Sequence, residues 1–77
     1  MPVIARLNNA KIQMFADDHA PPHFHLFGPS SNALVAIGTL TVIRGRADVR
    51  DLAEAVAWAR ANRRILIREW SRLNERG

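Results

Sequence analysis

Two carboxylates, three imidazoles and two prolines lie within nine consecutive residues, 17–25, which read DDHAPPHFH. This segment holds every histidine of the chain. Imidazoles exchange protons near neutral pH and bind divalent metal ions, and carboxylates bind the same ions or orient the imidazoles. Three interpretations are open: a metal site, a site of proton transfer or phosphate contact, and a polar turn held by its own hydrogen bonds.

The spacing of His23 and His25 bears most directly on the metal interpretation. On the strand predicted for this part of the chain, residues two apart point to the same face, with Cα atoms about 6.5 Å apart. Two imidazoles placed in this way can bind one divalent ion, for which Zn²⁺ and Ni²⁺ are the candidates. The other interpretations require no cofactor.

The remaining residues of the segment are less certain members of a metal site. His19 reaches the other two histidines only if the diproline segment turns back sharply, which a cis bond at either proline would favour. Asp17 or Asp18 would supply a carboxylate ligand or orient an imidazole.

An enzymatic alternative uses the same side chains without a metal. His23 and His25, together with Asp18 and His19, are the candidate catalytic residues of a small metal-independent ribonuclease. In that mechanism two imidazoles act as general acid and base, while arginines stabilise phosphate charge.

The charge of the chain is concentrated in its second half. Eleven basic residues against seven acidic ones give a net charge of +4. Residues 44–77 hold nine arginines against five acids. This asymmetry favours a nucleic acid or an acidic protein as partner, and the contacting side chains are expected to be Arg44, Arg46, Arg60, Arg64, Arg68 and Arg72. The last four recur every four residues, so on a helix they form a row that is either this surface or a solvated face.

Length and composition predict one soluble domain over residues 1–77. The chain has no cysteine, no signal peptide and no apolar stretch of the roughly 20 residues that span a bilayer. We therefore expect a cytoplasmic protein that does not enter membranes. A chain of this size buries a small core, so association with a partner or as a homodimer would add stability.

Residues 1–45 read as strands and hairpins. Strands are predicted over 3–7 and 11–15, joined by a tight turn at Asn8-Asn9 that uses positive φ, and over 23–27. Residues 28–32 (GPSSN) read as a loop. A second hairpin is predicted from 34–37 and 40–44 around a type II′ turn at Gly38-Thr39.

Residues 46–77 read as helical and basic. Asp48 is the expected N-cap, and Val49, Leu52, Val56 and Ala59 recur at helical spacing. Asn62 would cap a second helix whose apolar stripe is Leu66, Trp70 and Leu73, although one kinked helix fits nearly as well. The predicted fold is α+β, a small antiparallel sheet of four to five strands with the helical part packed on one face.

The segment MFADDHAPPHFHLF resembles a family of small prokaryotic proteins, the domain-of-unknown-function family 4160. The start MPVIARLNNAKIQM, the turn IGTLTVIRG and the tryptophans Trp58 and Trp70 carry the same resemblance, which covers nearly the whole chain. It implies an α+β domain that is often encoded beside another small protein, as in toxin–antitoxin pairs, and it assigns no reaction or cofactor. The expected function is that of a small regulatory protein acting through a cognate partner from a neighbouring gene, through nucleic acid, or through both.

Overall fold

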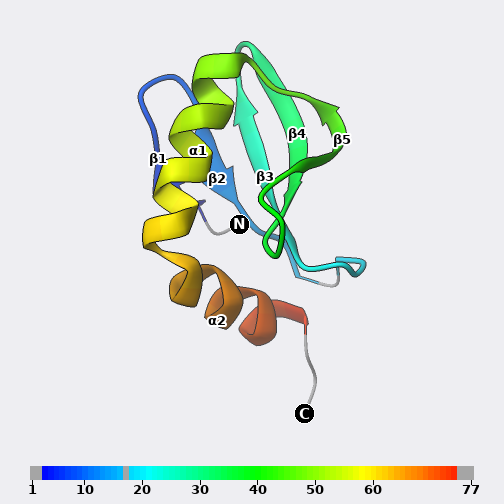
Figure 1. Cartoon of the computed structure of the whole chain (residues 1–77). Coiled ribbons are helices and arrows are strands. Elements are labelled where there is room, and N and C mark those ends of the chain that lie inside the picture. The colour runs from blue at the N-terminus through cyan, green and yellow to red at the C-terminus, as the bar shows by residue number, and fades with distance from the viewer. Residues whose placement is uncertain (1–2, 17, 75–77) are drawn as a thin grey trace.

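The computed structural model describes residues 3–16 and 18–74, which form a five-stranded antiparallel sheet followed by two helices (Figure 1). The strands follow one another across the sheet in chain order, as β1 (Val3–Arg6), β2 (Lys11–Gln13), β3 (His23–Gly28), β4 (Ser31–Ala36) and β5 (Val42–Arg46). The helices are α1 (Val49–Ala61) and α2 (Arg63–Asn74). The α+β prediction is confirmed, and the helical part forms two helices rather than one.

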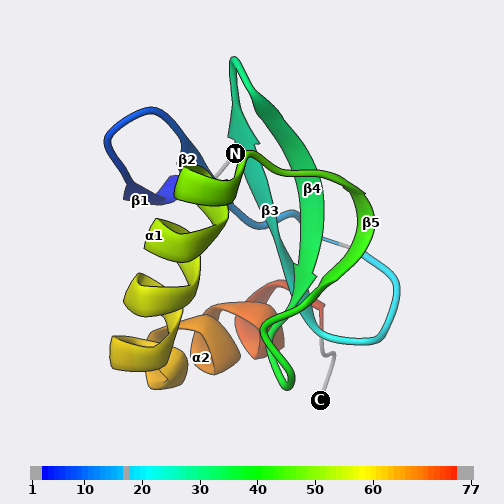
Figure 2. The ribbon, with the colours of Figure 1, turned by 45° about the horizontal axis from the view of Figure 1, so that its top comes forward.

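The core lies between one face of the sheet and the helices (Figure 2). Alternate residues of the strands point into it, because successive side chains of a strand leave opposite faces. The fully buried members on the sheet side are Ile12, Met14, Phe24, Leu26 and Val35. The helices contribute Ala55, Ala59, Leu66 and Trp70. Helix α1 packs on this face, whereas α2 crosses one end of the sheet, where its Trp70 also contacts the ring of His23.

The first hairpin forms where it was predicted, but its turn is of another kind. The Leu7 N–H donates to the carbonyl oxygen of Ala10 at 2.8 Å, which closes a two-residue loop at Asn8-Asn9. Among the described residues other than glycine, only Leu40 has a positive φ. The expectation of positive φ at the asparagines is therefore wrong, and bends with negative φ reverse the chain.

The predicted loop over residues 28–32 is wrong. Gly28 pairs with Ser31, so the chain turns within Pro29 and Ser30, and β4 begins at Ser31. Turn-forming composition located the reversal but overestimated its length. Ser31 belongs to the strand because its side chain is buried and bonded to the first turn of α1.

The type II′ turn predicted at Gly38-Thr39 is also wrong. Gly38 does not have positive φ, and β5 begins at Val42 after a longer connection. The Leu40 N–H donates to the carbonyl oxygen of Ala36 at 2.8 Å, while Leu40 takes φ 57°. This conformation directs Leu40 into the core, where it is 8% exposed, and burial of its side chain offsets the strain of the backbone.

Helix α1 starts at the predicted cap, and most of its predicted apolar stripe faces the core. The Asp48 carboxylate accepts the N–H groups of Arg50 and Asp51, as an N-cap does. Val49, expected in the core, is 81% exposed, and the buried positions are Asp51, Ala55 and Ala59. Of the predicted stripe, Ala59 is buried and Leu52 and Val56 pack against the core, so only Val49 was misplaced.

Asn62 joins the two helices rather than simply starting the second. Its side-chain Nδ2 donates to the carbonyl oxygen of Trp58 at 2.9 Å and so closes α1. Its own carbonyl oxygen accepts the N–H of Leu66 in the first turn of α2. In α2, Leu66 and Trp70 are buried as predicted, and Trp58 lies half-buried at the edge of the core. No helix of the described chain is long and apolar enough to cross a membrane.

Candidate metal centre

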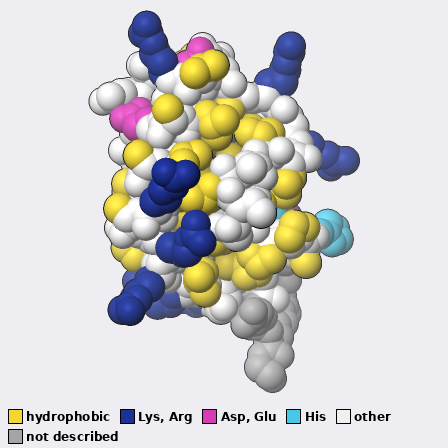
Figure 3. All heavy atoms as spheres, viewed as in Figure 1, with side chains coloured by type: hydrophobic (Ala, Val, Ile, Leu, Met, Phe, Trp, Pro, Cys, Tyr) yellow, Lys and Arg dark blue, Asp and Glu magenta, His cyan; other side chains and the backbone are white. Residues whose placement is uncertain are grey.

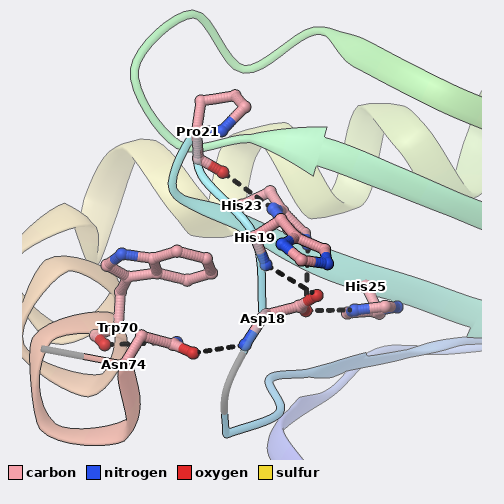
Figure 4. A network of polar contacts seen from close by, with 7 residues as sticks. All are labelled: Asp18, His19, Pro21, His23, His25, Trp70 and Asn74. Atoms are coloured by element: carbon pink, nitrogen blue, oxygen red, sulfur yellow. Dashed lines mark hydrogen bonds and ion pairs between the residues drawn. The ribbon is translucent and has the colours of Figure 1, made fainter.

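Three side chains of the 17–25 segment converge on one point, and we call them the Asp–His cluster: Asp18, His23 and His25 (Figure 4). The Oδ2 atom of Asp18 lies 3.0 Å from Nε2 of His23 and 3.0 Å from Nε2 of His25. One possible ligand atom from each residue lies within 4.8 Å of the other two. The cluster is partly shielded, since the exposed fraction is 4% for the His23 side chain and 27% for that of His25.

Strand β3 and helix α2 hold the cluster in place. His23 and His25 leave the same face of β3, as their spacing predicts. Asp18 lies in the loop before that strand, and its N–H donates to Oδ1 of Asn74 at 2.6 Å. Asn74 in turn donates from Nδ2 to the carbonyl oxygen of Trp70, so the last turn of α2 anchors the loop (Figure 4).

The two imidazoles are also oriented by aromatic neighbours. The His23 ring lies 5.1 Å from the Trp70 ring, measured between centroids. The Phe15 ring meets the His25 ring in an edge contact with the centroids 4.5 Å apart. Both rings are thus fixed before any ligand binds, which lowers the entropic cost of ordering them around one.

One hydrogen bond determines which nitrogen of His23 carries a proton. Nδ1 lies 2.8 Å from the carbonyl oxygen of Pro21, and a carbonyl oxygen can only accept, so Nδ1–H is the donor. In a neutral ring Nε2 then has a lone pair, which faces the carboxylate oxygen of Asp18. Two acceptors 3.0 Å apart repel each other. The contact is favourable only when a positive charge joins them, either a second ring proton or a metal cation.

The carboxyl group of Asp18 is held in its ionised form. Partial burial by itself would raise its pKa, but the hydrogen bond from His25, the electrostatic interaction with each imidazole when that ring is protonated, and the His19 N–H outweigh that effect. The pKa of Asp18 therefore lies below its ordinary value of 3.8. An ionised carboxylate beside two imidazole nitrogens is a suitable donor set for a divalent transition metal.

The distances fit a shared ion after small side-chain movements. Zinc–nitrogen and zinc–carboxylate distances run from about 2.0 to 2.2 Å, so two ligand atoms in tetrahedral coordination lie about 3.3–3.6 Å apart. Both carboxylate–imidazole separations are 3.0 Å, so the side chains would move slightly apart to hold an ion between them. The Nδ1–H bond to a backbone carbonyl is the outer contact that metal-binding histidines usually make.

His19, the other described residue considered as a ligand, lies outside the cluster. His19 is exposed and contributes only its backbone N–H, which donates to Oδ1 of Asp18 at 3.2 Å. The Ala20–Pro21 peptide bond is cis, one of the two positions considered. Asp17 lies outside the described residues.

The six candidate arginines divide into two groups. Arg44 lines a hollow of about 250 Å³ together with Asp18, His19 and His23, so it lies beside the cluster. Arg46 follows it on the same strand. The remaining four project from α1 and α2, and we call them the helix row: Arg60, Arg64, Arg68 and Arg72.

The helix row is exposed and partly neutralised. Arg72 donates to Oε1 of Glu69 at 2.7 Å, and Arg68 lies 4.0 Å from the same carboxylate. The hydrogen bond from Arg72 lowers the pKa of Glu69. From the side of the helices, basic side chains stand apart with hydrophobic surface between them (Figure 3).

Sequence reasoning missed two groups that complete the cluster, the carbonyl oxygen of Pro21 and the side chain of Asn74. No local signal identifies a backbone carbonyl as a partner of His23. Asn74 is 56 residues from Asp18 along the chain, and only the packing of α2 brings them together.

The match to a family model agrees with the resemblance noted from the motifs. The model described as "Domain of unknown function (DUF4160)" matches residues 10–71. The chain belongs to the DUF4160 family. The matched residues include the whole Asp–His cluster and most of both helices. No curated protein and no solved structure matches the chain.

Proposed function

We propose that the Asp–His cluster binds one divalent metal ion, Zn²⁺ or Ni²⁺, through Asp18, His23 Nε2 and His25 Nε2. The observation that carries the proposal is the Nδ1–H bond of His23 to Pro21, which turns the Nε2 lone pair toward the carboxylate. A metal cation satisfies both acceptors at once, and it also engages Nε2 of His25. Three protein ligands leave a coordination position open for an external ligand.

Calorimetric titration of the untagged protein with Zn²⁺ and with Ni²⁺ tests this proposal. We expect one ion per chain at neutral pH and weaker binding in acid, because protons compete for the imidazole nitrogens. His25→Gln and Asp18→Asn each remove one ligand and keep similar size. Each should weaken binding by more than the roughly 10–100-fold that loss of an outer contact costs.

His19→Gln is the matched control, since His19 is the one histidine outside the cluster and is exposed. Its metal affinity should equal that of the wild type. The proposal fails if the wild type binds neither ion at neutral pH. It fails equally if the loss of His19 and the loss of His25 weaken binding to the same extent.

Acid–base cleavage of RNA by His23 and His25 has less support from the geometry. Both ring nitrogens of His23 are engaged, its side chain is buried, and the two Nε2 atoms face one carboxylate oxygen. RNA cleavage by the wild type in the presence of a chelator, lost in His25→Gln, would favour the enzyme over the metal site.

A partner protein is a second candidate, and an apolar groove favours it. The groove has a volume of about 490 Å³ and is lined mainly by Pro21, Pro22, Ile37, Ile43 and Ile67. Two of these side chains are large, hydrophobic and about half exposed, Ile43 at 45% and Ile67 at 51%. Strand β5 beside it is a sheet edge whose residues are all exposed. We infer that the small partner of a toxin–antitoxin-like pair binds here.

Co-purification with the product of the neighbouring gene tests the partner. Ile67→Lys should abolish the complex, because it places a charge in the groove. Val49→Lys is the control, since Val49 is 81% exposed and is not among the residues lining the groove. Recovery of the complex with Ile67→Lys would contradict the inference, and so would a groove occupied only by a second copy of this chain.

A further inference from the structure

One line of side chains crosses all five strands on the face opposite the core. The strand register pairs Arg6 with Lys11, Lys11 with Phe27, Phe27 with Asn32, and Asn32 with Arg46. Directly paired residues of antiparallel strands point to the same face. We call these five residues the sheet row. With strands about 4.8 Å apart, the row is about 19 Å long.

The face assignment follows from the neighbouring positions. Ile12, Leu26 and Ala33, each next to a member of the sheet row along its strand, are buried in the core. Because successive side chains alternate, the sheet row must point away from it. His25, two residues before Phe27 on β3, points to the same face, so the sheet row runs beside the Asp–His cluster.

An exposed aromatic ring stands in the middle of the sheet row. Phe27 is 45% exposed, and the ammonium group of Lys11 lies 6.0 Å from the centre of its ring. Two shallow hollows adjoin Phe27. One, of about 500 Å³, is lined also by Arg6 and Lys11, and the other, of about 520 Å³, by Asn32 and Arg46.

The acidic and basic side chains on the five strands are all of one sign. None of the five strands contains an aspartate or glutamate, whereas the sheet row has three cations, Arg6, Lys11 and Arg46. Cations that contact phosphates, together with an exposed ring on which a base stacks, are the means by which proteins bind single strands. RNA-recognition domains place such rings on an antiparallel sheet. A duplex keeps its bases stacked and would not reach the ring.

We propose that the sheet row binds a single-stranded nucleic acid, with one base stacked on Phe27 and the backbone phosphates on Arg6, Lys11 and Arg46. Asn32 offers both a donor and an acceptor to a base edge. The proposal does not depend on the metal site, because none of the five residues belongs to the Asp–His cluster.

The test measures fluorescence anisotropy of labelled single strands of about 12 nucleotides, as RNA and as DNA of the same sequence, with the duplex for comparison. A chelator in every sample removes metal, so failure of the metal proposal leaves this result unaffected. We expect the wild type to bind a single strand more tightly than the duplex. Preference for RNA over DNA would assign contacts to the 2′-hydroxyl.

Two variants distinguish the contribution of base stacking to binding from the contribution of positive charge. Phe27→Leu keeps an apolar strand residue and should weaken binding by about tenfold, within the range that loss of one stacked base causes. Lys11→Gln with Arg46→Gln should weaken binding and reduce the slope of log affinity against log salt from about −2 to about −0.7. Circular dichroism checks that both variants fold.

Arg64→Gln with Arg68→Gln is the matched control, because it removes the same charge from the helix row. Its affinity should stay within about twofold of the wild type at moderate salt, where distant charges are screened. The proposal is overturned if the wild type binds no single strand. It is overturned also if this control weakens binding as much as the double substitution in the sheet row, or if Phe27→Leu binds like the wild type.

Discussion

The helix row and the sheet face differ in how their side chains are arranged. On the face opposite the core, Asp18 lies 3.0 Å from each imidazole of the Asp–His cluster, and the sheet row places three cations in one line with an exposed ring. The four arginines of the helix row diverge into solvent, and two of them share Glu69. A set of polar residues suggests a binding site when the fold makes the side chains converge, and a solvated surface when it does not.

The largest loss of stability should come from a substitution at Gly45 in β5, which has φ +83°. A Cβ atom there would lie 2.2 Å from the carbonyl oxygen of Asn32. Gly45→Ala should therefore lower the free energy of unfolding by about 2 kcal/mol or more, measured by urea denaturation, and displace Arg46 from the sheet row.

Gly38→Ala is its control. A Cβ atom at Gly38 meets nothing within 4 Å, and the backbone there does not have positive φ. Its stability should be unchanged or raised by up to about 1 kcal/mol. Equal losses in the two variants would refute the close approach of β5 to β4.

The next largest loss of stability should come from breaking the hydrogen bonds that link the sheet to α1. The Ser31 hydroxyl donates to the buried Asp51 carboxylate at 2.6 Å and accepts the Asp48 N–H at 3.0 Å. Ser31→Ala leaves a buried carboxylate without its donor and should cost about 1–3 kcal/mol. Ser30→Ala, at the exposed neighbouring position, should change stability by less than about 0.5 kcal/mol. If Ser31→Ala left the stability unchanged, Asp51 would have another hydrogen-bond donor.

Removing the charge of Asp18 should have a smaller effect on stability, and this effect should depend on pH. Its pKa is lower in the folded state than the ordinary 3.8, so its ionised form stabilises the fold above that pH. The contribution is lost as pH falls through the folded pKa. Unfolding free energies measured from about pH 7 down to about pH 2.5 should therefore converge for wild type and Asp18→Asn in acid. Parallel curves would contradict the ionised state of Asp18.

The smallest effect should come from the helix row. Glu69→Gln removes the carboxylate that Arg68 and Arg72 share at the surface, and exposed ion pairs contribute little. Thermal melting should hardly change, and neither should affinity for a single strand. Tighter binding by Glu69→Gln would indicate that the helix row is the nucleic-acid surface after all.

Much of the fold and part of the candidate site could be predicted from the sequence. The rest depends on contacts between residues that are far apart in the chain. Alternation and capping predicted the α+β fold, the strand that bears His23 and His25, and the start of α1 at Asp48. Helical spacing also predicted the row of Arg64, Arg68 and Arg72 on one helix, whereas Arg60 belongs to the other helix. The sheet row could not be predicted from the sequence, because its members are adjacent only through the register of five strands.

The errors at the turns and in α1 have the same origin. The connection after β4 is set by burial of Leu40, and the additional buried positions of α1 are set by close packing of Ala55 and by the bond from Ser31 to Asp51. Neither effect can be predicted from the local spacing of apolar residues. The contact between Asn74 and Asp18 likewise exists only because α2 crosses the end of the sheet that holds the cluster.

The most direct test of the Asp–His cluster is a long-range proton–nitrogen correlation spectrum of the three imidazole rings, recorded with and without Zn²⁺. We predict that Zn²⁺ moves the Nε2 resonances of His23 and His25 to the metal-bound position while His23 Nδ1 keeps its proton. His19 should not change. A His23 ring that carries protons on both nitrogens and ignores Zn²⁺ would contradict the account and make the cluster a hydrogen-bonded turn.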